Sequence, residues 1–399
     1  MARESTDILI SGGGVAGLCA AVAFGAAEFS VLCVDPATPI TDQAVEGADL
    51  RSTAFLMPSV ALLQEIGLWA RFAPHAAALQ VMRIVDAGGD AGVARLTRDF
   101  DAAEISEAPF GYNLPNWLLR REMLAEIATM PNVHFRPGVA TARVMPRESE
   151  ALVSLSDGSS WRAKLLIGAD GRNSSVRQAL GISVKTTRYG QKALAFTTTH
   201  PVPHQNVSTE VHRSGGPFTM VPLPDHEGLP ASAVVWMETG AEIARLSALS
   251  LPEFDAEMSL RACHLLGPMH RISALTTWPI ISQVAARMSG ERTALMAEAA
   301  HVVPPIGAQG LNMSLGDLAA LRSLALENRA ALGAAPMLEA YHNRRHREVQ
   351  ARVAGIDALN RASMVGAPML RDLRAQILGA LYSLAPVRKT LMKAGLGLR

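Results

Sequence analysis

A run of glycines near the start of the chain has the spacing of a nucleotide-binding loop. Its residues follow the pattern G-x-G-x-x-G: Gly12, Gly14, Val15, Ala16 and Gly17. An apolar segment predicted as a strand (8–10) precedes it, a predicted helix (18–27) follows, and a second apolar run (31–34) ends at Asp35. In such a unit the glycine backbone and the free helix N–H groups receive a pyrophosphate, while the acid accepts hydrogen bonds from a ribose. The sequence therefore predicts a dinucleotide site.

A second candidate follows a buried strand predicted at 165–167. This strand leads into Asp170 and a glycine, and a helix is predicted to begin shortly afterwards. An aspartate at such a strand end either faces the ligand crevice or caps the helix, because aspartate is also favoured as an N-cap.

A third candidate begins where a strand predicted at 293–296 runs into Ala297 and Glu298. A loop with two prolines and two glycines then leads to a helix predicted to begin near Leu311. The N–H groups at a helix N-terminus stabilise negative charge. We therefore predict that Gly310, Leu311 and Asn312, with Pro305 before them, surround a planar ligand that carries negative charge.

Together the three motifs resemble the FAD-dependent aromatic hydroxylases, the flavoprotein monooxygenases typified by para-hydroxybenzoate hydroxylase. Further segments resemble the ubiquinone-biosynthesis branch of that family: 49–54, 111–112 with Asn116 and Leu119, 220–224 with 235–236, and Tyr341 with Arg345. The resemblance covers most of the chain.

The resemblance implies a role for each matching position. The glycine loop would hold the FAD pyrophosphate, and Asp35 the adenosine ribose. Arg51 and Asn116 would flank the pyrophosphate and ribityl chain, and Asp170 would face the cofactor. Pro305 and the turn 310–312 would contact the flavin ring, where a reduced flavin carries negative charge. No side-chain acid or base is assigned, and the substrate wall is expected near Pro222, Leu223 and Trp236.

The third motif departs from the family pattern. The family has Gly-Asp where this chain has Ala297-Glu298. The acid of the family bonds a ribityl hydroxyl, and Glu298 carries the same charge on a longer side chain. An alanine at 297 is expected to exclude a positive φ there.

Bulk composition excludes several function classes. The 399 residues carry 37 Lys and Arg against 36 Asp and Glu, so no global field favours nucleic acid. Three cysteines are expected as free buried thiols in a reducing cytoplasm. We expect no signal peptide and no membrane-spanning segment, hence a cytoplasmic protein. His301 has no partner at metal-ligand spacing, so it is predicted to be structural, and no metal is predicted.

The expected fold is α/β, with a Rossmann-like FAD-binding domain, an inserted, mostly antiparallel β-sheet substrate domain and a C-terminal helical segment. We assign 1–73, 112–180 and 286–345 to the first, 74–111 and 181–285 to the second, and 346–399 to the third. In the last segment, leucines and an isoleucine between 370 and 384 repeat every three or four residues beside many basic residues. Two interpretations of this stripe remain open: it packs on the body of the protein, or it docks on an anionic membrane or a biosynthetic complex. A homodimer is a further alternative for the assembly of the protein.

The expected function is an FAD-dependent monooxygenase that uses NAD(P)H and O2 to hydroxylate a phenolic ring, with a polyprenylated ubiquinone precursor as substrate. The alternatives are a hydroxylase of another small aromatic compound, a flavin-dependent reductase, and a non-catalytic partner in a biosynthetic complex that keeps the fold of the FAD domain.

Overall fold

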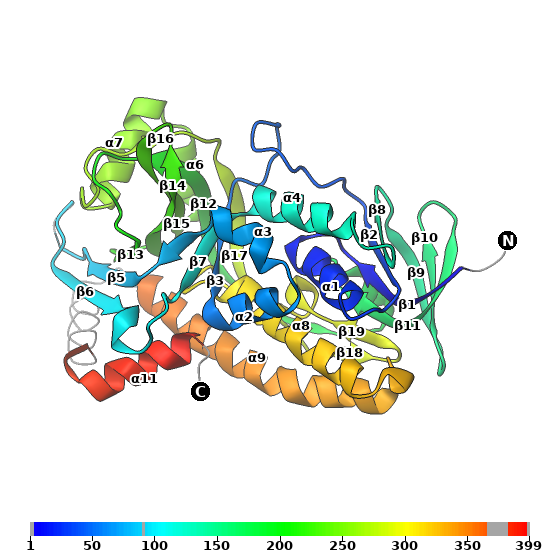
Figure 1. Cartoon of the computed structure of the whole chain (residues 1–399). Helices are drawn as coiled ribbons and strands as arrows, with labels where there is room; N and C mark the ends of the chain where they lie inside the picture. Colours follow the sequence, from blue (N-terminus) through cyan, green and yellow to red (C-terminus); the bar gives the residue numbers. More distant parts are fainter. Residues whose placement is uncertain (1–3, 90–91, 365–381, 397–399) are drawn as a thin grey trace.

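The computed structural model describes residues 4–89, 92–364 and 382–396. Two large sheets form the body of the chain, and Figure 1 shows them at opposite ends of the molecule, with two long helices running along one side. The predicted α/β fold class is confirmed.

The first sheet holds the three motifs. Its strands lie in the order β18-β19-β11-β1-β2-β8, and the hairpin strands β9 and β10 extend it beside β11. The neighbours from β19 to β8 pair in parallel, which places the carboxyl ends of β1, β11 and β19 at one edge. The strands are β1 (Glu4–Ser11), β2 (Val31–Asp35), β8 (Val133–Pro137), β9 (Thr141–Pro146), β10 (Ala151–Leu155), β11 (Ser160–Gly168), β18 (Ser289–Gly290) and β19 (Thr293–Leu295).

The second sheet is mostly antiparallel, in the order β20-β17-β12-β15-β14-β13-β5-β6, with β16 beside β12. Strands β5 and β13 pair in parallel. The strands are β5 (Val81–Asp86), β6 (Leu96–Asp101), β12 (Val184–Thr199), β13 (Val207–His212), β14 (Pro217–His226), β15 (Leu229–Thr239), β16 (His270–Arg271), β17 (Thr276–Ala285) and β20 (His301–Val302).

The two faces of the second sheet pack against different cores, because successive side chains of a strand point to opposite faces. On β12 and β15, Leu194 and Trp236 belong to a cluster with helices α6 (Gly240–Ser247) and α7 (Leu251–Arg261). Their neighbours Ala193 and Val235 pack instead with the core of the first sheet. The helices α6 and α7 were not predicted from the sequence.

A small third sheet joins the two large ones. It consists of β3 (Ser52–Leu56), β7 (Gly111–Pro115) and β4 (Ala77–Leu79). From the sequence alone, the apolar run 54–68 is predicted to form a helix. This prediction is wrong at its start, because 54–56 pair with β7 and α2 (Met57–Glu65) begins only afterwards. The predicted division into domains stays a proposal.

The remaining helices cover the sheets. Helices α1 (Val15–Gly25) and α4 (Asn116–Ile127) pack on each other beside the first sheet (Figure 1). The long pair α8 (Gln309–Glu327) and α9 (Ala335–Met364) lie side by side. Shorter helical elements complete the set: α3 (Trp69–Phe72), α5 (Ser175–Ala179), η1 (Ala73–His75), η2 (Ala102–Glu104), η3 (Ala297–Ala299) and η4 (Arg329–Ala331).

The last described helix, α11 (Ala385–Leu396), packs on the body near the second sheet. Met392 is buried in a cluster with Phe100 and Phe110, and Arg388 donates to Glu104 at 2.7 Å. Most of the apolar stripe predicted between 370 and 384 lies outside the described residues. Within the part of the chain that is described, no helix has both the length and the apolar content needed to cross a bilayer.

Candidate functional site

The glycine loop follows β1, and its three motif glycines serve different purposes. A Cβ at Gly12, whose φ is +114°, would lie 2.3 Å from the carbonyl oxygen of Ala169, and one at Gly17 would lie 1.9 Å from that of Gly12. These two glycines are therefore required by packing. A Cβ at Gly14 would meet nothing within 4 Å, so this space is open to a ligand.

The N-terminus of α1 opens onto the same space. Gly14 is the N-cap residue and offers no side-chain cap, and no acidic residue stands in the first turn. Because the first N–H groups of a helix have no acceptor within it, those around Val15 and Ala16 are available to an anion.

Asp35 stands at the end of β2 and reaches back to the glycine loop. Its Oδ2 accepts a hydrogen bond from the Gly13 N–H at 2.6 Å, and its Oδ1 accepts from the Ala37 N–H at 2.8 Å. The carboxylate thus holds the loop in shape, and each oxygen retains a second lone pair for a ribose hydroxyl.

Asp49 organises the residues expected at the pyrophosphate and ribityl chain. It accepts from Arg51 Nε at 2.7 Å, from Asn116 Nδ2 at 3.1 Å and from Arg120 Nη2 at 3.2 Å. Burial raises the pKa of Asp49, but the hydrogen bonds of Arg51 and Asn116 and the charges of Arg51 and Arg120 together outweigh burial, so that pKa lies below its ordinary value. The carboxylate is ionised and fixes two guanidinium groups and an amide. Sequence reasoning included Asp49 in a motif without a role and missed Arg120.

Asp170 bonds to the first turn of α5, although the N-cap residue of that helix is Ser174. Its Oδ2 accepts from Ser175 Oγ at 3.0 Å and from the Val176 N–H at 3.1 Å, at the start of α5. Its Oδ1 is buried and has no hydrogen-bond partner in the described structure. A buried carboxylate oxygen without a donor is costly, which indicates that a ligand supplies one.

The second and third motifs are tied together by arginines. Arg177, which is buried, donates to the carbonyl oxygen of Ala299 at 2.8 Å and to that of Arg172 at 2.9 Å. The side chain of Arg172 forms an ion pair with Glu298, with Nε 3.4 Å from Oε2. Glu298 thus lies at the site, where its carboxylate is half-exposed.

The backbone at Ala297 contradicts the expectation for an alanine there. Its φ is +55°, in the left-handed region that an alanine was expected to exclude. Asp317 of α8 holds this turn: its carboxylate accepts from the Ala297 N–H at 3.2 Å, pairs with His301 Nε2 at 2.6 Å and accepts from Arg345 Nε at 2.9 Å. His301 is buried in this network, as its structural prediction requires.

The side chain of Asn312 fastens the N-terminus of α8 to the third sheet. Its Oδ1 accepts from the Leu56 N–H and from Ser59 Oγ, and its Nδ2 donates to the carbonyl oxygens of Ala54 and Ala308, all within 2.9 Å. This side chain has no capacity left for a ligand. The free donors at this helix end are the backbone N–H groups, including those of Gly310 and Leu311.

The loop before α8 leaves open space beside Gly310. A Cβ at Gly310 would meet nothing within 4 Å, and Pro305 is half-buried in the rigid turn that precedes the helix. The open space at both glycines, the Asp170 oxygen without a donor and the two free helix N-termini fit the pyrophosphate, ribityl chain and ring of FAD.

The predicted substrate residues divide between the faces of the second sheet. Trp236 packs with Phe218 and Phe254 beneath α6 and α7, on the face away from the first sheet. Leu223 lies in a small cluster with two alanines, and the carbonyl oxygen of Pro222 accepts from Asn113 at 2.9 Å. The side chain that faces the first sheet beside Trp236 is Val235.

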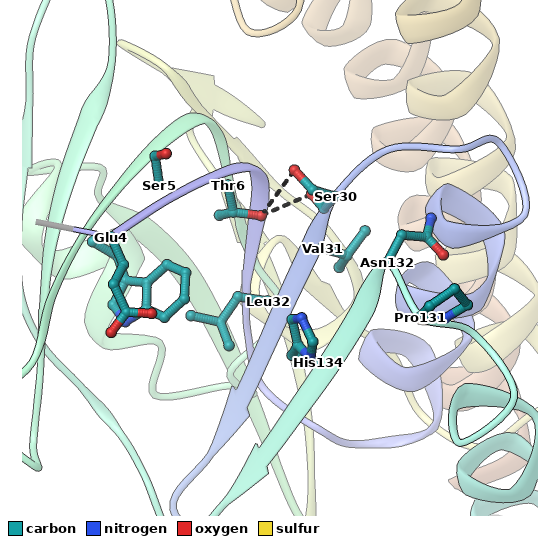
Figure 2. A pocket seen from close by; sticks show the side chains of 10 residues that line it. Glu4, Ser5, Thr6, Ser30, Val31, Leu32, Pro131, Asn132 and His134 are labelled. Atoms are coloured by element: carbon teal, nitrogen blue, oxygen red, sulfur yellow. Dashed lines mark hydrogen bonds between the residues drawn. The ribbon is translucent and has the colours of Figure 1, made fainter.

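A pocket of about 510 Å³ lies at the other edge of the first sheet (Figure 2). Its lining comes from the amino ends of β1, β2, β8 and β11, and includes Thr6, Leu32, His134 and Trp161. Parallel α/β sheets bind ligands at the carboxyl ends of their strands, so this pocket is separate from the crevice described above.

Comparison with known proteins agrees with this geometry. The family model described as an FAD binding domain matches residues 5–355. The chain therefore belongs to the family of FAD-dependent aromatic hydroxylases. It binds FAD and is a monooxygenase.

The similarity to individual relatives extends over nearly the whole chain. Ubiquinone hydroxylase UbiL of Rhodospirillum rubrum is 31% identical, covering 99% of this chain and 90% of the relative. The 3-demethoxyubiquinol 3-hydroxylase of Escherichia coli is 28% identical over 100% of both chains. Among solved structures, p-nitrophenol 4-monooxygenase PnpA from Pseudomonas putida shares the fold, with a TM-score of 0.80, 19% identity and coverage of 100% of both chains.

Proposed function

We propose that this monooxygenase hydroxylates the phenolic ring of a polyprenylated ubiquinone precursor, with NAD(P)H as the reductant. In this reaction O2 supplies one oxygen atom to a ring carbon and the other to water. The two electrons come from NAD(P)H, and a proton balances the equation. The observation that carries the substrate class is the similarity to two ubiquinone-pathway hydroxylases over at least 99% of the chain.

The residues of the crevice bind and orient rather than exchange protons with the substrate. FAD, when bound, supplies the redox chemistry by accepting electrons from the reductant and activating O2. Gly14 and the N-terminus of α1 would receive the pyrophosphate, with Arg51 and Asn116 beside it. The N–H groups of Gly310 and Leu311 would stabilise negative charge on the reduced ring.

The face of the second sheet that packs toward the first would form the substrate wall. Its side chains that pack with the core of the first sheet are apolar, such as Ala193, Val235 and Met237. Such a wall excludes water from the reacting ring, which protects the activated oxygen from loss to solvent.

The substrate is tested by the quinone intermediates of cells that lack this protein. We expect a polyprenylated phenol, one hydroxyl short of a later intermediate, to accumulate and to disappear when the wild-type gene is restored. Restoration by a Gly14→Val variant that binds no FAD would indicate the non-catalytic alternative. An unchanged quinone profile would refute the ubiquinone assignment and favour another aromatic substrate.

The reaction type is tested with the purified protein and 18O-labelled O2. Incorporation of one labelled atom into the product is expected of a monooxygenase. Anaerobic turnover with an added acceptor, and no label in the product, would identify a flavin-dependent reductase instead.

Location and partners are part of the proposal. We place the protein in the cytoplasm, with peripheral contact at the inner face of the membrane, where a prenylated substrate resides. On α11, Val387 and Leu391 are 36% and 48% exposed, and Leu384 just before it is 57% exposed. Co-flotation with anionic vesicles tests membrane contact, and light scattering after size-exclusion chromatography tests the homodimer.

A further inference from the structure

Arg172 and Glu298 meet where two neighbouring strands of the first sheet end. Strands β11 and β19 run in parallel, with Gly168 opposite Leu295 at their carboxyl ends. Arg172 lies four residues beyond the first of these and Glu298 three beyond the second. Both side chains are therefore at the edge of the sheet that carries the FAD crevice.

The backbones beneath this ion pair are held in place. Arg177 bonds to carbonyl oxygens on both segments, as described above, and it is only 4% exposed. The side chains above are far more accessible, with 30% of Arg172 and 51% of Glu298 exposed. The two backbone segments are thus fixed, while the side chains that form the ion pair are exposed to solvent.

The ion pair lies beside a group that indicates a ligand. Arg172 is two residues beyond Asp170, whose Oδ1 is buried and has no hydrogen-bond partner in the described structure. Next to this oxygen the ion pair contributes two solvent-accessible charges.

Glu298 also affects the pKa of Arg51, the cation expected beside the pyrophosphate. Hydrogen bonding to Asp49 raises the pKa of Arg51, and the negative charge of Glu298 adds to this effect. Glu298 is therefore close enough to two guanidinium groups, those of Arg172 and Arg51, to influence both.

We propose that Arg172 and Glu298 form a bridge over the solvent side of the crevice, which retains bound FAD and must open before FAD leaves. The proposal rests on FAD binding and adds a role for two residues in the lifetime of the complex. Exposed ion pairs are weak, so removal of the bridge accelerates FAD release by about two- to fivefold.

The test measures FAD release directly, without turnover. Protein loaded with FAD is mixed with an excess of a competing FAD-binding apoprotein, and the flavin fluorescence is followed in time. We expect Glu298→Gln and Arg172→Gln each to release FAD about two- to fivefold faster than wild type. The double variant is expected to release FAD no faster than either single variant, because both changes remove the same bridge.

Salt provides a second readout. Raising the ionic strength from about 0.05 M to about 0.5 M screens exposed charges, so the difference between wild type and Glu298→Gln should shrink. A matched control is Glu339→Gln, which removes the Arg287–Glu339 ion pair between the end of β17 and α9. That pair has exposed fractions of 49% and 52%, and its loss should leave the release rate unchanged.

Unchanged release in both single variants would overturn the bridge, and so would effects that multiply in the double variant. A wild-type protein that takes up no FAD would overturn the cofactor assignment together with the bridge. The two failures are therefore distinguishable.

Discussion

Replacing Gly14 by valine should separate cofactor binding from folding. Gly14 has φ −68° and ψ 176°, an extended conformation that any residue adopts, and a Cβ there meets no atom within 4 Å. The folded protein without FAD should therefore tolerate a valine side chain at this position, with a change in unfolding free energy within about 0.5 kcal/mol.

The same side chain should prevent the close approach of a pyrophosphate. Hydrogen bonds to a charged group contribute about 1.5–3 kcal/mol each, so losing two of them weakens binding by at least about 3 kcal/mol. This corresponds to roughly a hundredfold increase in the Kd for FAD. Titration calorimetry of the FAD-free protein measures the Kd, and thermal unfolding of the same preparation measures stability.

Gly355 offers a matched control. It is an exposed glycine in α9, and a Cβ there also meets nothing within 4 Å. Gly355→Val should leave the affinity for FAD unchanged. If Gly14→Val bound FAD as tightly as wild type, the pyrophosphate would not lie against this backbone and the placement of FAD would be refuted.

Three further predictions concern the surroundings of the crevice. Ala297→Gly should raise the unfolding free energy by about 0.5–1 kcal/mol. A left-handed alanine costs about 1–2 kcal/mol, and the greater conformational entropy that glycine loses on folding offsets part of the gain from removing that cost. A lower melting temperature of the variant would contradict this prediction. Asp317→Ala should lower the unfolding free energy by about 3–5 kcal/mol, because it leaves the buried Arg345 guanidinium unpaired. Burial raises the pKa of Asp317, but His301 and Arg345 lower it more. The stability that this carboxylate provides is therefore present above pH 3.8, its ordinary pKa, and is lost as the pH falls below that value. Chemical denaturation across this pH range checks the prediction, because the wild type should lose more stability than the variant. Val235→Trp should raise KM for the aromatic substrate by about tenfold, while Trp236→Phe should lower the melting temperature and leave KM unchanged; the reverse pattern would place the substrate on the other face of the sheet.

The parts of the site that could be predicted from the sequence are those defined by local spacing. The glycine loop, Asp170 and the start of α8 each belong to a strand–loop–helix segment, and Asp35 ends the strand that follows the first of these segments. Each pattern is visible within about twenty residues. Their arrangement at one sheet edge followed from parallel pairing, which the structure contains.

The residues that were missed act over long separations in the chain. Asp317 joins 297, 301 and 345, and Arg177 reaches 299. No periodicity reveals such contacts, because they depend on how the elements pack. The start of the helix expected at 54 failed for a similar reason: pairing with β7 overrides an apolar run that suits either structure.

The position of β19 in the first sheet has a consequence for how the protein is made. This strand pairs with β11, although more than a hundred residues, including most of the second sheet, separate them in the chain. Glu298 and the start of α8 follow it, so a ribosome must translate about three quarters of the 399 residues before the FAD site is complete. Nascent chains cut short before residue 293 should therefore form the second sheet's hairpins yet stay colourless, and loading with FAD becomes a late event of biosynthesis.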